Sequence, residues 1–230
     1  MKKNYRAILF LLFIALLCQT EAAAQYLNPK VESKQSVIRS VVILPPKIEI
    51  VKESAKGTEG MVKESAELSV KISELVAQAL QEKKITVLSS PFANLSAEDM
   101  DKKYGLADIQ SRYDALLPKM VKHSKDVKKE RFTLGDEILT LNVDKSADAV
   151  IFIRGTGKRL TKGKTALSIL NPFSFDFPYM FVTIGIVDAR TGEVLALAKP
   201  VQFRDVTNPK AEKPLKKMII KSLKKLPDAP

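Results

Sequence analysis

Short apolar runs alternate along the chain with stretches in which apolar residues recur every three or four positions. The first run, Val37–Pro46 (VIRSVVILPP), is rich in β-branched residues and ends at two prolines, which predicts a buried strand. Residues 61–83 predict an amphipathic helix packed on one face, because Glu and Lys fill the positions between the apolar ones. The apolar stripe consists of Val62, Ala66, Leu68, Ser69, Ile72, Leu75, Val76, Ala79 and Leu80. Ile85–Ser90 predicts the next strand of a strand–helix–strand unit.

The second half of the chain begins with helical patterns. Ser96, followed by Asp99, resembles a capping box and predicts a helix start. Another helical stretch is expected near Gly135, with an inward face formed by Ile138, Leu139, Leu141 and Val143.

Strands return after this helical region. Ala147–Gly155 (ADAVIFIRG) predicts the most buried strand. Two later apolar runs flank residues 188–192, where Gly192 is placed to take a positive φ, which predicts a hairpin. A last amphipathic helix is expected before Pro227, with Leu215, Met218, Ile219, Leu223 and Leu226 on one face.

This order predicts an α/β fold with a mixed sheet of about five strands packed by helices. Residues 37–230 are expected to form one domain with a helical insert at 96–143, preceded by an extended lead-in at 25–36. No stretch between these segments is long enough to be an interdomain linker.

The N-terminus has the pattern of a secretory signal peptide. Lys2, Lys3 and Arg6 precede the apolar run Ala7–Leu17, and residues 22–24 form an A-x-A cleavage site. The run is too short to cross a hydrocarbon core of roughly 30 Å. Residues 1–24 are therefore predicted to be removed, and the chain is expected in the periplasm or in association with the outer membrane.

Cys18 is the chain's one cysteine and raises the question of lipidation. Lipoprotein processing prefers a small residue before the cysteine, whereas Leu17 stands there, so cleavage after Ala24 is preferred to lipidation. The mature chain would then have no disulfide despite an oxidising compartment.

The chain is strongly basic, with a formal net charge of +12. The signal peptide carries three positive charges and Glu21, so its removal leaves about +10. One interpretation is a solvated basic surface; the other is attraction to an anionic membrane or envelope polymer. Secretion argues against nucleic acid as the partner.

The segments VVILPP, ITVLSS, ADAVIFIRG and VDARTGEVL, in this order and followed by a C-terminal helix, resemble a group of bacterial envelope proteins. These are the CsgG-like and TolB N-terminal-like periplasmic domains, including the LpoB-type and PelC-type lipoproteins, and the resemblance covers residues 37–226. It implies a non-enzymatic accessory domain that acts through protein partners or homo-oligomeric rings. The chain departs from the group in its poor lipidation site and its long helical insert.

The stretch Ile153–Thr165 (IRGTGKRLTKGKT) ends like a phosphate-binding loop. That loop needs G-x4-G-K-[ST] before a helix, whereas five residues separate Gly157 from Gly163 and Pro172 interrupts any following helix. A basic hairpin or surface loop is therefore expected, and a nucleotide-binding protein remains the third hypothesis.

Catalytic constellations are sparse. The single histidine, His123, lies among lysines beside Ser124 and Asp126, and sequence neighbours do not make a triad. No metal site, cofactor or catalytic residue is assigned. The pairs Asp136–Glu137 and Asp99/Asp101 keep a carboxylate-based periplasmic hydrolase open as the alternative function.

An alternating aromatic row follows the basic stretch: Phe173, Phe175, Phe177, Tyr179 and Phe181. These side chains share one face of an extended chain, either entering the core or offering rings to a partner. The leading hypothesis is a non-catalytic envelope accessory or assembly protein that binds envelope proteins or an anionic surface. Its candidate binding residues are Lys158, Arg159, Lys162, Lys164, Phe173, Phe175, Phe177 and Tyr179.

Overall fold

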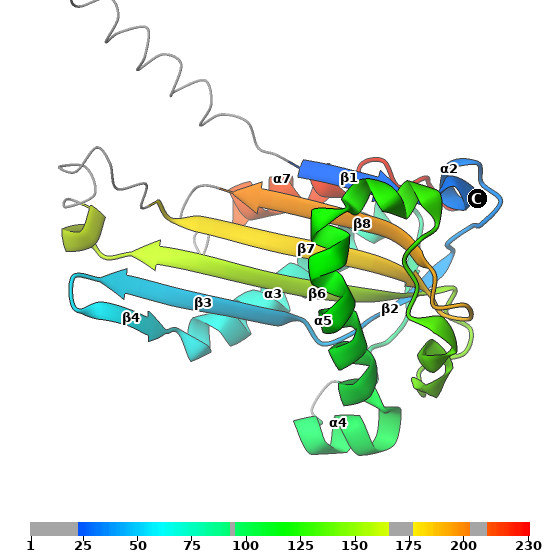
Figure 1. Ribbon diagram of the computed structural model, residues 1–230, viewed down its shortest axis with the longest axis horizontal. Helices are drawn as coiled ribbons and strands as arrows, with labels where there is room; N and C mark the ends of the chain where they lie inside the picture. Colours follow the sequence, from blue (N-terminus) through cyan, green and yellow to red (C-terminus); the bar gives the residue numbers. More distant parts are fainter. Residues whose placement is uncertain (1–22, 93–94, 166–176, 203–210) are drawn as a thin grey trace, which may run out of the picture.

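The computed structural model describes residues 23–92, 95–165, 177–202 and 211–230 (Figure 1). Its elements are, in chain order, β1 (Ala23–Leu27), α2 (Pro29–Glu32), β2 (Ser40–Ile43), β3 (Lys47–Ser54), β4 (Gly57–Gly60), α3 (Val62–Gln81), β5 (Thr86–Val87), α4 (Ala97–Tyr104), α5 (Leu106–Lys122), the 3₁₀ helices η1 (Ser124–Lys129) and η2 (Gly135–Thr140), β6 (Ala149–Leu160), β7 (Tyr179–Asp188), β8 (Val194–Gln202) and α7 (Glu212–Ser222). The lead-in at 25–36 thus contains most of β1 and all of α2.

The strands form one mixed eight-stranded sheet in the order β1-β8-β7-β6-β2-β5, with β3 also paired to β6 and β4 paired to β3. β2 and β3 run parallel to β6, and β2 also runs parallel to β5. The β6–β7, β7–β8, β1–β8 and β3–β4 pairs are antiparallel. The predicted α/β class with a mixed sheet is confirmed, and the sheet is larger than the sequence pattern indicated.

Two prolines divide what would otherwise be one long strand beside β6. β2 pairs with the start of β6, where Val41 is opposite Ala149, and β3 pairs with its later half, where Lys47 is opposite Arg154. Pro45 and Pro46 lie between β2 and β3 and have no N–H to donate to a ladder. The charged stretch after them forms the β3–β4 hairpin.

One face of the sheet is covered by α3 and α7 (Figure 1). The predicted stripe of α3 is buried at Leu68, Ile72, Leu75, Val76, Ala79 and Leu80. It does not extend to the helix start, because Val62 is 82% exposed and Ala66 is also exposed. The first turn instead makes a polar contact, in which Ser65 Oγ accepts from Ile50 N at 2.9 Å. In α7, the predicted residues Leu215, Met218 and Ile219 are buried.

The opposite face is crossed by α5, which packs a second hydrophobic core onto β6, β7 and β8 (Figure 1). The Tyr113 ring stacks on Phe152, with centroids 4.1 Å apart and planes 9° apart. Tyr113 lies so close to β7 that a Cβ on Gly185 would collide with its phenol oxygen. Both cores therefore rest on the same central strands.

The insert at 96–143 is helical, as expected, but not uniformly α-helical. Ser96 caps α4, since its Oγ accepts from Asp99 N at 3.1 Å, which confirms the predicted helix start. Near Gly135 the helix is of the 3₁₀ type, with three residues per turn. Leu139, one position after the buried Ile138, is 63% exposed, so its predicted inward position is wrong.

The β7–β8 connection matches the predicted hairpin. Gly192 has a φ of +71°, as expected for a turn glycine. Among the described residues, no helix has both the length and the apolar character that crossing a membrane requires.

Candidate functional site

Lys158 and Arg159 lie on a strand, not on the basic loop that the sequence pattern indicated. β6 continues to Leu160, and both residues are paired with β3, opposite Val51 and Lys52. The sequence pattern indicated the end of the strand at Gly155, because glycine commonly marks a turn. Here it allows close packing: a Cβ at this position would lie 2.8 Å from Ile48 Cδ1. Glycine in a strand interior often marks such a close approach.

The last four residues of the basic stretch, 162–165, form a helical turn that contains Gly163-Lys164-Thr165. Two of its amide groups are already engaged, since Thr165 N donates to Thr161 O at 2.9 Å and Lys164 N donates to Thr161 Oγ1 at 3.3 Å. A phosphate-binding loop needs such amides to face the ligand. The described part of this stretch therefore gives no support to a nucleotide site.

Strand alternation places Lys158 and Arg159 on opposite faces of the sheet. On β6, Val150 and Phe152 belong to the core under α5, so Lys158 points to the α5 side and Arg159 to the α3 side. The Lys158 side chain is only 15% exposed, and its Nζ lies 3.6 Å from Glu53 Oε2. The same Nζ lies 5.6 Å from the centre of the Tyr179 ring. Lys158 is therefore a partnered cation and not a free charge on the surface.

The described part of the aromatic row lies at the same place. Tyr179 is opposite Lys158 on β7, and Phe181 is opposite Thr156, so the two rings share the α5-side face. Both are half-buried, and Phe177, just before β7, is 55% exposed. Phe173 and Phe175 lie outside the described residues.

The face of the sheet that α5 crosses is not covered by any described helix in its part toward the β3–β4 hairpin (Figure 1). We call this surface the open half-face; it is formed by Lys47, Glu49, Val51 and Glu53 of β3, Thr156, Lys158 and Leu160 of β6, and Tyr179 and Phe181 of β7. All nine side chains are exposed or half-buried. The structure thus brings Lys158 and Tyr179 together, whereas Arg159 points to the other face and Lys162 and Lys164 lie on the turn after β6.

A buried cation marks the border between the open half-face and α5. Arg154 Nε donates to Asp114 Oδ1 of α5, and Lys47 Nζ donates to Asp114 Oδ2 at 2.9 Å. The guanidinium lies 5.4 Å from the centre of the Tyr113 ring, whose hydroxyl has a raised pKa because it is buried. Within the described chain, Tyr113 Oη, Arg154 Nη2 and Thr183 Oγ1 are buried without a hydrogen-bond partner. This ion pair fixes α5 across the sheet at the edge of the covered area.

His123 and its neighbours do not form a catalytic arrangement. His123 is exposed, whereas Ser124 is buried and its Oγ accepts from Lys199 Nζ at 2.9 Å. Asp126 pairs with Lys129 at 3.1 Å, and this hydrogen bond lowers the pKa of the Asp126 carboxyl. Among the described residues, no three histidine, cysteine or acidic side chains are grouped as a metal site requires.

The carboxylates considered for a hydrolase have structural partners. The Ser96 hydroxyl donates to Asp99 Oδ2 at 2.6 Å at the start of α4, and Asp101 Oδ1 accepts from Ala107 N at 2.8 Å. Glu137 forms an ion pair with Arg112 at 2.9 Å, and Asp136 is exposed on η2. None of these four side chains lines any of the three hollows of the described residues that are considered below.

Two other carboxylates do line a common hollow of about 200 Å³, at the end of the sheet where β6 begins. Asp148 Oδ2 accepts from the backbone N–H groups of Arg39 and Ser40, at 2.9 and 3.2 Å. Asp188 Oδ1 accepts from the N–H groups of the following turn, at 2.8 and 2.9 Å. Both acids therefore satisfy backbone donors, which is the usual role of aspartate in turns.

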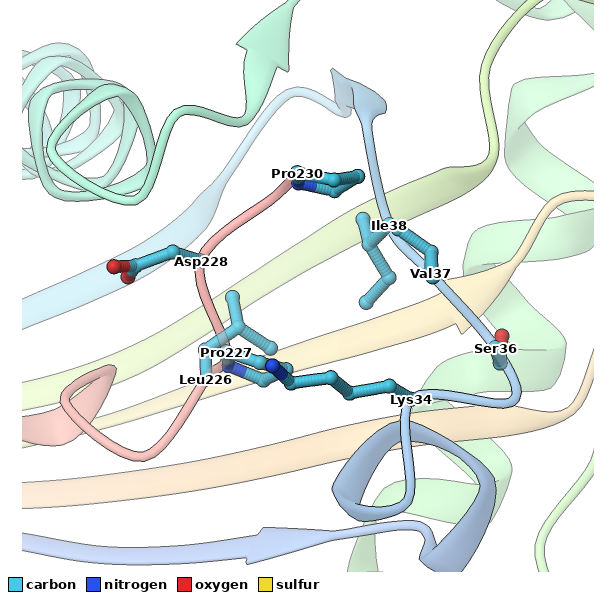
Figure 2. Close-up of a pocket in the computed structure, with 8 residues that line it drawn as sticks. All are labelled: Lys34, Ser36, Val37, Ile38, Leu226, Pro227, Asp228 and Pro230. Atoms are coloured by element: carbon cyan, nitrogen blue, oxygen red, sulfur yellow. The ribbon is translucent and has the colours of Figure 1, made fainter.

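A second hollow at this end lies between residues 34–38 and the C-terminal residues, where the Lys34 side chain extends toward Leu226 and Pro227 (Figure 2). Its volume is about 120 Å³. Sites for small organic ligands usually measure roughly 300–1,000 Å³. This hollow therefore has room for one aliphatic side chain and not for a cofactor.

No family model matches the sequence, and no curated protein matches it. Among solved structures, the chain is similar to the PelC dodecamer from Paraburkholderia phytofirmans, with a TM-score of 0.39, 11% sequence identity, and coverage of 91% of this chain and 98% of that chain. A single-substitution variant of that dodecamer gives 0.39 and 11%, covering 91% and 99%. Lipoprotein GNA1162 from Neisseria meningitidis gives 0.36 and 12%, covering 81% and 96%. A structural similarity to PelC and to an envelope lipoprotein, as the sequence pattern suggested, is thus present at low sequence identity.

Proposed function

We propose that the chain is a secreted, non-catalytic accessory protein of the cell envelope that binds a protein partner through the open half-face. The observation that carries the proposal is an ordered sheet surface with half-exposed rings that no described element covers. Aromatic side chains at intermediate exposure are typical of binding surfaces, because they bury a large area at a small entropic cost.

The charges of the open half-face favour a protein over an anionic membrane or polymer. Lys47 and Lys158 are offset on the same surface by Glu49 and Glu53. A surface with balanced charge has no net attraction for a polyanion, whereas a protein can present complementary charges to each group. Basic residues that are not part of the open half-face, such as the exposed Lys162, would contact the partner only at the rim of the interface.

The signal peptide predicted at residues 1–24 supports a place outside the inner membrane. The partners considered are therefore envelope proteins, and a second copy of the chain is one of them. An accessory role also agrees with the hydrogen bonds and ion pairs of the carboxylates described above. Among the described residues, no arrangement of acids supports the hydrolase hypothesis.

The proposal is tested by placing a photo-crosslinking amino acid at Thr156, which is exposed near the centre of the open half-face. The matched control carries the same amino acid at Gln78, which is exposed on α3 behind the sheet. In intact cells, we expect a discrete adduct from position 156 and none from position 78. The proposal is wrong if position 156 gives no adduct, or if both positions give the same one.

A further inference from the structure

A hollow of about 370 Å³ lies at the far end of the sheet from the open half-face. Its walls come from η2, the segment that follows it, the start of β6 and the turn between β7 and β8. Val150 lines this hollow, and Thr156 lies six residues further along β6 on the open half-face. Six residues of extended chain span about 20 Å, so the two surfaces are separate.

The interior of the hollow is mainly apolar. Ile138, Leu141, Ala147 and Val150 are buried side chains that also line it, and Val143 is half-buried beside them. The volume falls within the roughly 300–1,000 Å³ that small-molecule sites occupy. The two neighbouring hollows, at about 120 and 200 Å³, do not reach that range.

Leu139 belongs to the same lining and leaves a large apolar side chain in water. It is 63% exposed, although the preceding residue of η2, Ile138, is buried. Covering such a side chain with an apolar ligand would be favourable, by about 25 cal/mol for each Å² removed from water.

The polar groups of the hollow favour an anion. Lys145 and Arg190 both line it, and within the described chain neither side chain has an ion pair. The one acid of the lining, Asp144, is engaged in its own turn, where its Oδ1 accepts from Ser146 N at 2.9 Å. That backbone hydrogen bond lowers the pKa of the Asp144 carboxyl. Two cations that have no ion pair with the described residues therefore accompany an apolar interior.

We propose that this hollow binds a single-chain anionic amphiphile. The acyl chain would lie against Leu141, Val143 and Leu139, and the carboxylate or phosphate head would meet Lys145 and Arg190. The site is independent of the partner surface proposed above, because it lies at the opposite end of β6 and shares no residue with it.

The test is calorimetric titration of the purified mature chain at pH 7 with sodium dodecanoate, below its micellar concentration. Dodecyl maltoside carries the same chain without the charge, and dodecyl phosphate carries a different anion. We expect saturable one-to-one binding of both anions and at least fivefold weaker binding of the maltoside. Equal affinity for dodecanoate and the maltoside would overturn the proposal, as would the absence of saturable dodecanoate binding.

Variants identify the site. Arg190→Gln is expected to weaken dodecanoate binding about two- to fivefold, the range for one exposed charge pair, and to leave maltoside binding unchanged. Leu139→Asn should weaken both ligands. The control Lys56→Gln removes the same charge from the exposed β3–β4 turn and should change neither. An effect of Arg190→Gln no larger than that of Lys56→Gln would contradict the proposal, since it would mean a general charge effect.

A bilayer arm separates a free amphiphile from a lipid surface. Vesicles of phosphatidylglycerol are added to the protein in a sedimentation assay, with and without prior saturation by dodecanoate. We expect the protein to bind dodecanoate. We expect no association with the vesicles that is lost in Arg190→Gln. Vesicle binding that is lost in Arg190→Gln, together with weak dodecanoate binding, would show a membrane-docking surface instead of the proposed site.

Discussion

Gly185 on β7 lies directly beneath the phenol of Tyr113, in a space that a larger residue cannot share. Tyr113 cannot move aside easily, because it is fully buried and stacked on Phe152. We expect Gly185→Ala to lower the free energy of unfolding by about 1–3 kcal/mol, as overpacking of a core usually does. Urea denaturation monitored by circular dichroism measures the change.

Gly163→Ala is the matched control, because a Cβ at that position meets no atom within 4 Å. Its effect should stay within about 0.5 kcal/mol, as at other unconstrained surface sites. Equal effects of the two substitutions would mean that Tyr113 does not constrain β7.

Phe177 is the exposed ring at the edge of the open half-face. Phe177→Ala should leave the unfolding midpoint almost unchanged, because little of the ring packs inside the protein. Loss of an aromatic anchor from an interface commonly costs more than about 1 kcal/mol of binding energy. The yield of the adduct from position 156 should therefore fall in Phe177→Ala cells, and an undiminished yield would exclude Phe177 from the interface.

At the scale of elements, we expect the order of α4 to depend on its N-cap residue, Ser96. The helix has eight residues, and Ser96, the residue before it, accepts from the N–H of Asp99. A helix this short is marginal by itself, so loss of the cap should cost about 1 kcal/mol of local stability. We expect Ser96→Ala to speed amide hydrogen exchange across α4, whereas Ser96→Asp, which keeps an acceptor, should not. Unchanged exchange in Ser96→Ala would show that tertiary packing alone orders the helix.

The elements also show what the sequence can predict. Periodicity identified α3, α7 and the β7–β8 hairpin, because each is set by local spacing and turn chemistry. The sequence pattern did not predict that β6 continues to Leu160, because glycines such as Gly155 and Gly157 occur both in turns and in tightly packed strands. Only the approach of Ile48, from a strand more than a hundred residues earlier, distinguishes the two.

The candidate site also combines features that local sequence predicts with features that depend on remote contacts. The alternation of Tyr179 and Phe181 predicted a shared face, and the structure has them on one. Glu49 and Glu53, which neutralise that face, were missed, although the alternation in Lys47–Ser54 (KIEIVKES) is a strand signal. Nothing local indicates that this strand lies beside Lys158, because the pairing is parallel and remote in sequence.

At the scale of the whole molecule, two hydrophobic cores share one sheet. Ile72 of α3 belongs to one core, Ile109 of α5 belongs to the other, and both are fully buried. We expect Ile72→Ala and Ile109→Ala each to cost about 2–5 kcal/mol of unfolding free energy. Because the cores share β6 and β7, each variant should unfold in one transition with an unchanged denaturant dependence. A split transition in Ile109→Ala alone would show that the helical insert melts as a separate unit.

The edge strand β1 has a consequence for the order of events during export. Its register places Ala24 opposite Lys199 and Gln25 opposite Ala198, so the predicted cleavage point lies between two residues that are paired with β8. The Gln25 side chain also accepts from Lys225 N at 2.7 Å, near the C-terminus. Proteins commonly bind an extended peptide as an added strand. An enzyme that cleaves after Ala24 could not bind this segment in that way once the segment is paired in the sheet. Cleavage after Ala24 would therefore have to come before β1 joins the sheet, and premature folding would protect the precursor from maturation.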